Sequence, residues 1–171
     1  SFAVDNAGDY ARERDAATVS QYHRRLLAMA LSAVCAGRFL ADRPPASAAE
    51  LAAEMKAPTR LVHAVLNVLV HAGVLVEVVG PKPRQTLYQP ARNPADMMLV
   101  SIAEAYDRAA RPDGEAPSPK DEVELVSNEA LGQTAVHWRA LAESIAASKD
   151  NLSLVELVVA ESGGSDRRKD S

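Results

Sequence analysis

Histidines and carboxylates are the side chains best suited to acid–base or metal chemistry, and their spacing in this sequence argues against both. Metal-assisted cleavage of a phosphodiester needs carboxylates or histidines that converge on ions about 4 Å apart. The four histidines fall on four separate segments, and the sequence has no HxxxH, HxH or DxD pattern. Three acidic residues near position 121 lie at the start of a predicted helix, where negative charge suits the helix dipole. We therefore expect no catalytic residues, no metal site and no cofactor. The histidines and the acidic residues are His23, His63, His71, His137, Asp121, Glu122 and Glu124.

The single cysteine, Cys35, lies within an apolar run. One cysteine excludes a disulfide framework and any cysteine-rich zinc or iron–sulfur site. Free cysteines inside apolar helices are usually buried and behave as small hydrophobic side chains. We therefore predict a buried structural thiol at Cys35.

A second group of polar residues suits the recognition of nucleic acid. Between Pro58 and Gly73 apolar residues recur at helical spacing and leave a polar face opposite. In a recognition helix, arginine pairs with guanine and asparagine with adenine. Two basic residues in the following turn could contact phosphates. The candidate nucleic-acid-binding residues are Thr59, Arg60, His63, Asn67, Lys82 and Arg84.

Charge limits what this surface can do. The chain has a formal net charge of −4, with +2 on residues 1–90 and −6 on residues 91–171. Only three of the candidate residues carry a formal positive charge, whereas DNA-binding proteins commonly make about 6–10 phosphate contacts. We therefore expect duplex DNA binding to be weak, with a homodimer doubling the number of contacts.

Composition favours a helical core. Of 171 residues, 47% are hydrophobic and only 4% are aromatic. The core must therefore consist of Leu, Val and Ala, and Ala and Leu have high helix propensities. The longest apolar stretch, residues 26–37, is shorter than the roughly 20 residues that a membrane-spanning helix needs.

The elements that position the candidate residues follow from periodicity and from helix start and stop signals. A capping box, Ser47 to Glu50, starts a short helix that ends at Met55. Pro83 and Pro90 place the two following strands at sheet edges, because proline lacks a backbone N–H. The predicted elements are helices over residues 21–41, 48–55 and 58–72, strands over 74–79 and 86–90, and helices from Asn93 to Tyr106, over 120–148 and after Ser153.

These elements divide the chain into five parts. Three prolines and one glycine mark residues 111–119 as a linker. The polar, glycine-bearing end of the chain is typical of disorder. We predict a lead-in segment over 1–20, a winged-helix domain over 21–110, the linker, a helical extension over 120–160 and a disordered tail over 161–171.

The helical extension carries an apolar stripe at a spacing of four, three and four residues. A self-complementary stripe of this kind suits a two-fold symmetric pair. We predict a homodimer whose interface contains Thr134, Trp138, Leu141 and Ile145.

The run Ser47-Ala48-Ala49-Glu50-Leu51-Ala52, with the following helix and Ala72-Gly73-Val74-Leu75, resembles that of many bacterial winged-helix regulators. Near the C-terminus, Trp138-Arg139 and Leu152-Ser153-Leu154-Val155-Glu156-Leu157 are similar to a pattern in the iron–sulfur, redox-sensing winged-helix repressors. The cluster ligands of those repressors are cysteines between the wing and this helix. No cysteine follows Cys35 in this sequence, so the resemblance does not extend to cluster binding.

Residues 2–160 also resemble the cytoplasmic C-terminal part of the YihY/BrkB family of inner-membrane proteins, long labelled ribonuclease BN. The resemblance rests on Phe2-Ala3-Val4-Asp5-Asn6, Tyr10, Arg24-Arg25-Leu26-Leu27-Ala28 and Pro90-Ala91-Arg92-Asn93-Pro94. It implies a position on the cytoplasmic side of the inner membrane, as a piece of a longer protein, which fits a chain that begins with Ser1 rather than Met.

Together these observations predict a mainly α protein: a winged helix-turn-helix with a two-stranded wing and a C-terminal helical extension. The first interpretation of function is a non-catalytic cytoplasmic regulatory or interaction domain of a YihY/BrkB-type membrane protein. Its partner would be another protein or its own membrane domain, and no small-molecule ligand is indicated. The alternative is a cytoplasmic DNA-binding transcriptional regulator. A third hypothesis, a ribonuclease in tRNA processing, lacks convergent catalytic groups.

Overall fold

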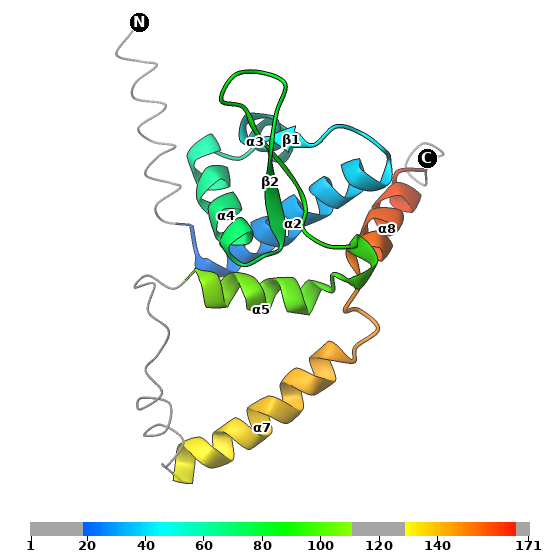
Figure 1. Cartoon of the computed structure of the whole chain (residues 1–171). Helices are drawn as coiled ribbons and strands as arrows, with labels where there is room; N and C mark the ends of the chain where they lie inside the picture. The colour runs from blue at the N-terminus through cyan, green and yellow to red at the C-terminus, as the bar shows by residue number, and fades with distance from the viewer. Residues whose placement is uncertain (1–18, 111–128, 167–171) are drawn as a thin grey trace, which may run out of the picture.

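The fold is mainly helical, with a small antiparallel sheet, and it confirms the predicted winged helix-turn-helix. The computed structural model describes residues 19–110 and 129–166 (Figure 1). The predicted lead-in up to residue 18, the linker and residues 120–128 lie outside the described residues. The elements, in chain order, are α2 (Gln21–Leu40), β1 (Ala46–Ser47), α3 (Ala48–Met55), α4 (Thr59–His71), β2 (Leu75–Val79), β3 (Thr86–Pro90), the 3-10 turn η1 (Pro94–Asp96), α5 (Leu99–Ala109), α7 (Glu129–Ala146) and α8 (Leu154–Asp166).

Helix α2 is the centre of the molecule, and α4, α5, α8 and β3 pack around it. The buried side chains are mostly Leu, Val and Ala, as the composition predicts. Tyr106 of α5, 2% exposed, is the largest fully buried side chain. Cys35 is also buried, at 2% exposure, as predicted. The packing thus rests on the short aliphatic side chains that also favour helix formation.

The residues that begin and end α3 and α4 lie at the predicted positions. The hydroxyl of Ser47 accepts a hydrogen bond from the Glu50 backbone N–H at 3.3 Å, and the Glu50 carboxylate accepts one from the Ser47 backbone N–H at 2.7 Å. Lys56 closes α3 in the left-handed conformation, with φ 51°. Gly73 follows α4 with φ 71°, a conformation that glycine adopts without steric cost.

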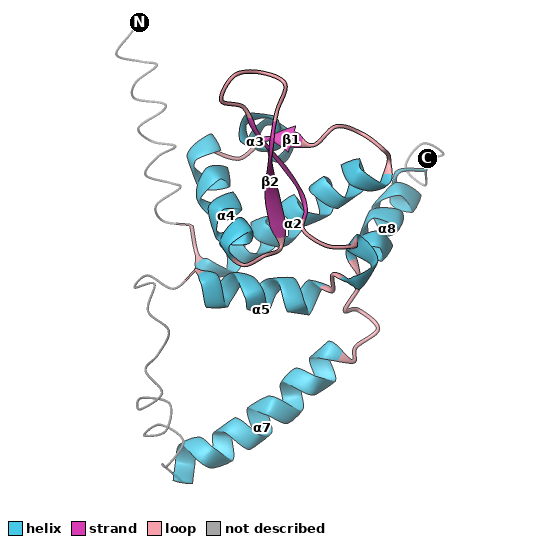
Figure 2. Ribbon diagram, in the orientation of Figure 1, coloured by secondary structure: helices cyan, strands magenta, loops and turns pink. Residues whose placement is uncertain are grey.

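Strands β2 and β3 form the predicted two-stranded wing, and the short β1 adds a third strand, so the sheet order is β1-β3-β2 (Figure 2). The short β1 pairs Ala46 with Tyr88, so β3 is the central strand and its prediction as an edge strand is wrong. Pro90 is tolerated because it lies at the end of β3, opposite Leu75 of β2 and beyond the residues that β1 pairs.

The helix predicted to run on from Asn93 is divided into η1 and α5. Between them the backbone N–H of Leu154 donates to the carbonyl of Met97 at 3.0 Å, and the N–H of Leu99 donates to the carbonyl of Leu152, also at 3.0 Å. Met98 and Ser153 form an isolated antiparallel bridge. The interruption therefore comes from a partner segment more than 50 residues further along the chain.

The C-terminal extension consists of two helices with different roles. Helix α7 stands away from the rest of the described structure, whereas α8 returns to α2 (Figures 1 and 2). Val158 of α8 packs beside Gly37 of α2, where a Cβ would lie 3.7 Å from its methyl groups. Because α8 extends to Asp166, the disorder predicted over 161–171 is wrong for residues 161–166.

Candidate nucleic-acid interface

Helix α4 presents one buried and one exposed face. Its buried face consists of Leu61, Val62, Val65, Leu66 and Leu69. The structure places all four predicted residues of this helix together on the opposite, exposed face. They are Thr59, Arg60, His63 and Asn67.

The turn between β2 and β3 presents the other two predicted residues, Lys82 and Arg84, both exposed. Gln85 holds this turn: its side-chain oxygen accepts from the Lys82 backbone N–H at 3.2 Å, and its carbonyl accepts from the Gly80 N–H at 2.8 Å. A Cβ at Gly80 would lie 2.5 Å from that side-chain oxygen, so any larger residue there would displace the Gln85 side chain. Arg84 adopts φ 57°, the left-handed conformation. The wing tip is thus a shaped turn rather than a loose loop.

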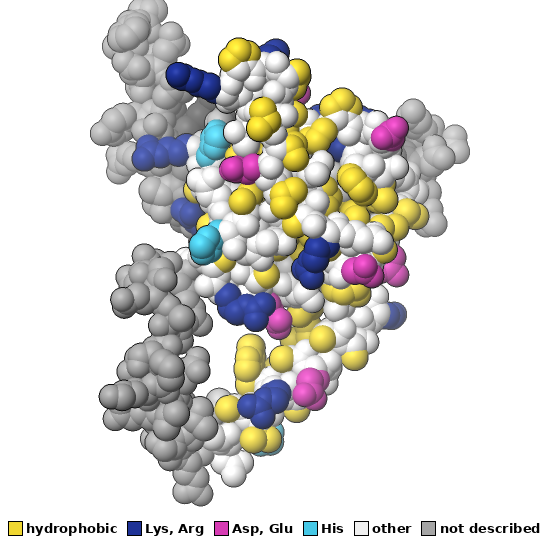
Figure 3. All heavy atoms as spheres, in the orientation of Figure 1, with side chains coloured by type: hydrophobic (Ala, Val, Ile, Leu, Met, Phe, Trp, Pro, Cys, Tyr) yellow, Lys and Arg dark blue, Asp and Glu magenta, His cyan; other side chains and the backbone are white. Residues whose placement is uncertain are grey.

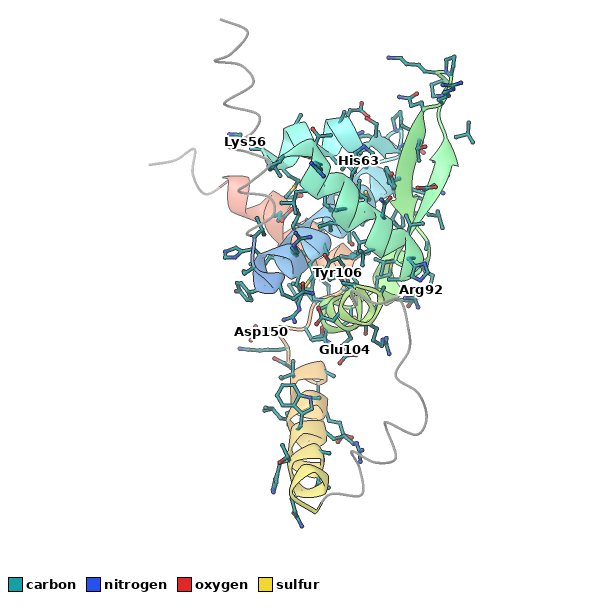
Figure 4. All side chains as sticks on the ribbon, turned by 90° about the vertical axis from the view of Figure 1, so that its left-hand side faces the viewer. Lys56, His63, Arg92, Glu104, Tyr106 and Asp150 are labelled. Atoms are coloured by element: carbon teal, nitrogen blue, oxygen red, sulfur yellow. The ribbon has the colours of Figure 1, made fainter. Side chains whose placement is uncertain are left out.

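Two basic residues that the sequence pattern did not single out lie on the same face as α4. Figure 4 shows Lys56 beyond one end of α4, His63 near its middle and Arg92 toward its other end. In Figure 3, Lys, Arg and His side chains gather along the left-hand edge, where α4 lies. Lys56 closes the turn before α4, and Arg92 follows β3. Both positions depend on tertiary packing, because α3 packs against α4, and β3 pairs with β2, which packs against α4. Local periodicity carries no signal for such packing.

The segment that contains α4 and the wing has a charge opposite in sign to that of the whole chain. From Lys56 to Arg92 the sequence contains five Lys or Arg residues and one acidic residue, Glu77, which gives a formal net charge of +4. The complete chain has −4. A local positive footprint of this kind attracts the phosphate backbone of DNA.

Among the residues that the structure describes, no three His, Cys, Asp or Glu side chains are grouped as metal ligands would be. His63 and His71 both lie on α4, His23 on α2 and His137 on α7, so the four histidines fall on three helices rather than on four segments. Burial raises the pKa of the Cys35 thiol to about 12, so this thiol is protonated at neutral pH.

The predicted dimer stripe is exposed on α7. Trp138 is 67% exposed, and Leu141 and Ile145 are 50% and 45% exposed. Val136, which the stripe did not include, is 59% exposed. Thr134 is exposed on the same helix. Trp138, Leu141 and Ile145 share one side of the helix, and exposed apolar side chains grouped in this way are typical of a contact surface.

The arrangement of α3, α4 and the β2–β3 wing defines the class: the chain has a winged helix-turn-helix fold. Solved structures with a similar fold include CymR (YrzC), described as the global cysteine regulator of B. subtilis, with a TM-score of 0.51, 13% identity and coverage of 83% of this chain and 95% of that one. Staphylococcus aureus CymR has a TM-score of 0.51, 17% identity and coverage of 80% and 95%. T. potens IscR has a TM-score of 0.52, 19% identity and coverage of 84% and 87%. At these identities the likeness concerns the fold.

Neither a protein-family model, that of YihY/BrkB included, nor a curated protein matches the chain. None of the helices in the described part of the chain is long and apolar enough to cross a membrane.

Proposed function

We propose that this chain is a DNA-binding transcriptional regulator that reads duplex DNA with α4 and the wing. The observation that carries the proposal is the formal charge of +4 from Lys56 to Arg92, the segment that contains α4 and the wing, in a chain of net charge −4. The fold it shares with CymR, described as a global regulator, supports the same function. We therefore prefer it to the first interpretation, a regulatory domain of a YihY/BrkB-type membrane protein.

The exposed side chains divide into readers of bases and binders of phosphate. Arg60 and Asn67, near the two ends of the α4 face, suit guanine and adenine edges in the major groove. Lys56, Lys82 and Arg92 surround α4 and suit phosphates on either side. With Arg84 of the wing, each protomer therefore offers four Lys or Arg side chains for phosphates besides Arg60, and a dimer eight. That number meets the roughly 6–10 phosphate contacts common among DNA-binding proteins, so the weak binding expected from three charges is revised.

We propose a homodimer that pairs the exposed apolar face of α7 with the same face of a second copy. Trp138, Leu141 and Ile145 lie at i, i+3 and i+7, one side of a helix. A two-fold pair places the same side chains on both sides of the seam. Two copies of α4 would then contact two half-sites related by the same symmetry.

The decisive experiment is selection of bound duplexes from random-sequence DNA, followed by binding measurements in a salt series. We expect one enriched sequence with two half-sites, bound at least about 10³-fold more tightly than random DNA. The same protein should fail to cleave precursor tRNA with Mg²⁺, Mn²⁺ or Zn²⁺, since we propose no catalytic activity. Binding that stays at roughly 10⁻⁴–10⁻⁶ M for every sequence would be only non-specific and would overturn the proposal.

A further inference from the structure

A cavity of about 510 Å³ opens at the C-terminal end of α2, and none of its lining residues belongs to α4. Its apolar walls are Cys35 and Phe39 of α2, together with Pro44 and Pro45 of the segment that joins α2 to β1. This volume falls within the roughly 300–1,000 Å³ typical of small-molecule sites. The protonated Cys35 thiol adds to the neutral wall.

Three polar side chains complete the lining: Asp42, Arg43 and Gln89. Asp42 and Arg43 are exposed at the mouth, and Gln89 is half-buried in β3. Salt bridges and side-chain hydrogen bonds in the described residues involve none of these three side chains. One negative and one positive group, adjacent in sequence, therefore line the same apolar cavity without neutralising each other.

Hydrogen bonds hold the backbone of these two residues in place. The backbone N–H of Asp42 donates to the carbonyl of Phe39 at 3.2 Å, and that of Arg43 donates to the carbonyl of Arg38 at 2.8 Å. Asp42 has φ 52°, so the chain reverses sharply at the mouth of the cavity. The guanidinium of Arg38 also donates to the carbonyl of Pro44 at 3.2 Å. The rim is thus a fixed turn, which reduces the entropy that a ligand must overcome in ordering it.

We propose that this cavity binds a small zwitterion with an apolar side chain, of the α-amino-acid type. The carboxylate pairs with Arg43, the ammonium group pairs with Asp42, and the apolar part packs against Phe39 and Pro45. The amide of Gln89 supplies a further hydrogen bond. A ligand with both charges is the one that leaves neither Asp42 nor Arg43 desolvated without a partner.

Occupancy of the cavity also bears on DNA binding, and this part of the inference rests on the proposed function. The segment with Pro44 and Pro45 leads directly into Ser47, the N-cap of α3. Arg38 joins the two parts, because its guanidinium binds the Pro44 carbonyl and lies 3.9 Å from the Glu54 carboxylate of α3. A ligand that shifts this rim therefore acts on the first helix of the helix-turn-helix, and we expect it to change affinity for DNA.

The test is an NMR titration of the whole chain with three probes that share a phenyl group. L-phenylalanine carries both charges, 3-phenylpropionate only the negative one and 2-phenylethylamine only the positive one. We expect saturable shifts of the Asp42 and Arg43 amides and the Gln89 side-chain amide with L-phenylalanine. The affinity for each single-charge probe should be lower by a factor of about ten or more, since that probe loses a charged hydrogen bond.

Two substitutions provide the matched variants. Asp42→Asn and Arg43→Gln should each weaken L-phenylalanine binding about tenfold. The control is Arg108→Gln, which replaces an exposed arginine of α5 outside the cavity and should leave binding unchanged. The inference is overturned if neither L-phenylalanine nor L-leucine causes saturable shifts, if the three probes bind equally, or if the variants bind like the wild type.

A DNA-binding measurement with and without L-phenylalanine tests the coupling separately. An unchanged affinity for the selected sequence would refute the coupling while the titration still decides the cavity. Failure to select any DNA sequence would count against the proposed function alone.

Discussion

Oδ1 of Asn151 accepts a hydrogen bond from the backbone N–H of Val100 at 3.0 Å. The side-chain N–H of the same residue donates to the carbonyl of Ala146 at 2.9 Å. One side chain therefore joins the end of α7 to the start of α5. Since α7 otherwise stands apart from the body, Asn151 determines where this helix leaves it (Figure 1).

Replacing Asn151 should weaken this junction. Asn151→Ala removes both hydrogen bonds and leaves the half-buried Val100 N–H without its partner, so the free energy of unfolding should fall by about 1–3 kcal/mol. The same substitution at Asn67, exposed on α4, should change it by less than about 0.5 kcal/mol. Urea unfolding of both variants measures the difference, and equal effects would show that the junction contributes no stability.

Removing the largest side chain of the α7 stripe should weaken the dimer. Trp138→Ala should cost about 2 kcal/mol or more of association, as loss of a buried aromatic anchor commonly does. Val159→Ala on α8 is the control, because Val159 is 65% exposed but lies outside the stripe. Sedimentation equilibrium at tens of micromolar is the measurement, and a monomeric wild type would refute the α7 pairing.

The capping box of α3 should make a pH-dependent contribution. The hydrogen bond from the Ser47 backbone lowers the pKa of the Glu50 carboxyl below its ordinary value. Stability gained from the ionised carboxylate is therefore present above the unfolded-state pKa of about 4.3 and is lost as the pH falls through the lower folded-state pKa.

Glu50→Gln tests this contribution. It should destabilise by a few tenths to about 1 kcal/mol at pH 7, and the difference from the wild type should shrink below about pH 4. Urea unfolding at pH 7 and below pH 4 is the measurement. The control is Glu104→Gln, which replaces an exposed glutamate of α5 that is not part of a capping box. A difference that stays constant with pH would exclude a role for the Glu50 charge.

Base-reading and phosphate-binding residues should respond differently to substitution. Arg60→Ala should cost about 1–3 kcal/mol on the selected sequence and relax the preference at one base position. Lys82→Ala should weaken all sequences alike and reduce the slope of log K against log salt by about 1. Fluorescence anisotropy in a salt series distinguishes loss of base recognition from loss of phosphate binding. If Arg60→Ala weakens binding to all sequences equally, Arg60 does not read a base.

The wing tip should be sensitive to a single added methyl group. Gly80→Ala would place a Cβ 2.5 Å from Oε1 of Gln85, so that side chain must move and its bond to the Lys82 N–H must break. We expect weaker DNA binding with little loss of overall stability, because the tip of the wing, unlike its strands, lies outside the core. Gln85→Ala removes the hydrogen bond between the Gln85 side chain and the Lys82 N–H without adding a side chain at position 80. If both variants bind DNA like the wild type, the shape of the tip is unimportant for binding.

Local rules account for most of the helical architecture. The apolar period of α4, the capping box at Ser47 and the glycine after α4 each act through neighbours a few residues away. The features that could not be predicted depend on distant partners. Residues 46 and 47 are too few to show a strand pattern and become β1 only because β3 is beside them. Likewise Leu152 and Leu154 interrupt the helix after Asn93.

The candidate site divides in the same way. Thr59, Arg60, His63 and Asn67 share a face because a helix of known period brings them together. Lys56 and Arg92 join that face through tertiary packing, so helical spacing alone could not identify them. The cavity at Asp42 and Arg43 has no signal in the sequence either, since Gln89 reaches it from β3 across the sheet.

The ion pair between Arg25 and Asp107, at 2.7 Å, brings the start of α2 beside the end of α5. Gln21 also donates to the Asp107 carboxylate, at 3.3 Å. Tension applied between residues 19 and 110 would therefore peel α5 from α2 one contact at a time, beginning at this corner, instead of shearing the two helices along their whole length. Under mechanical load, this half-buried ion pair would open before the fully buried Tyr106 ring is exposed.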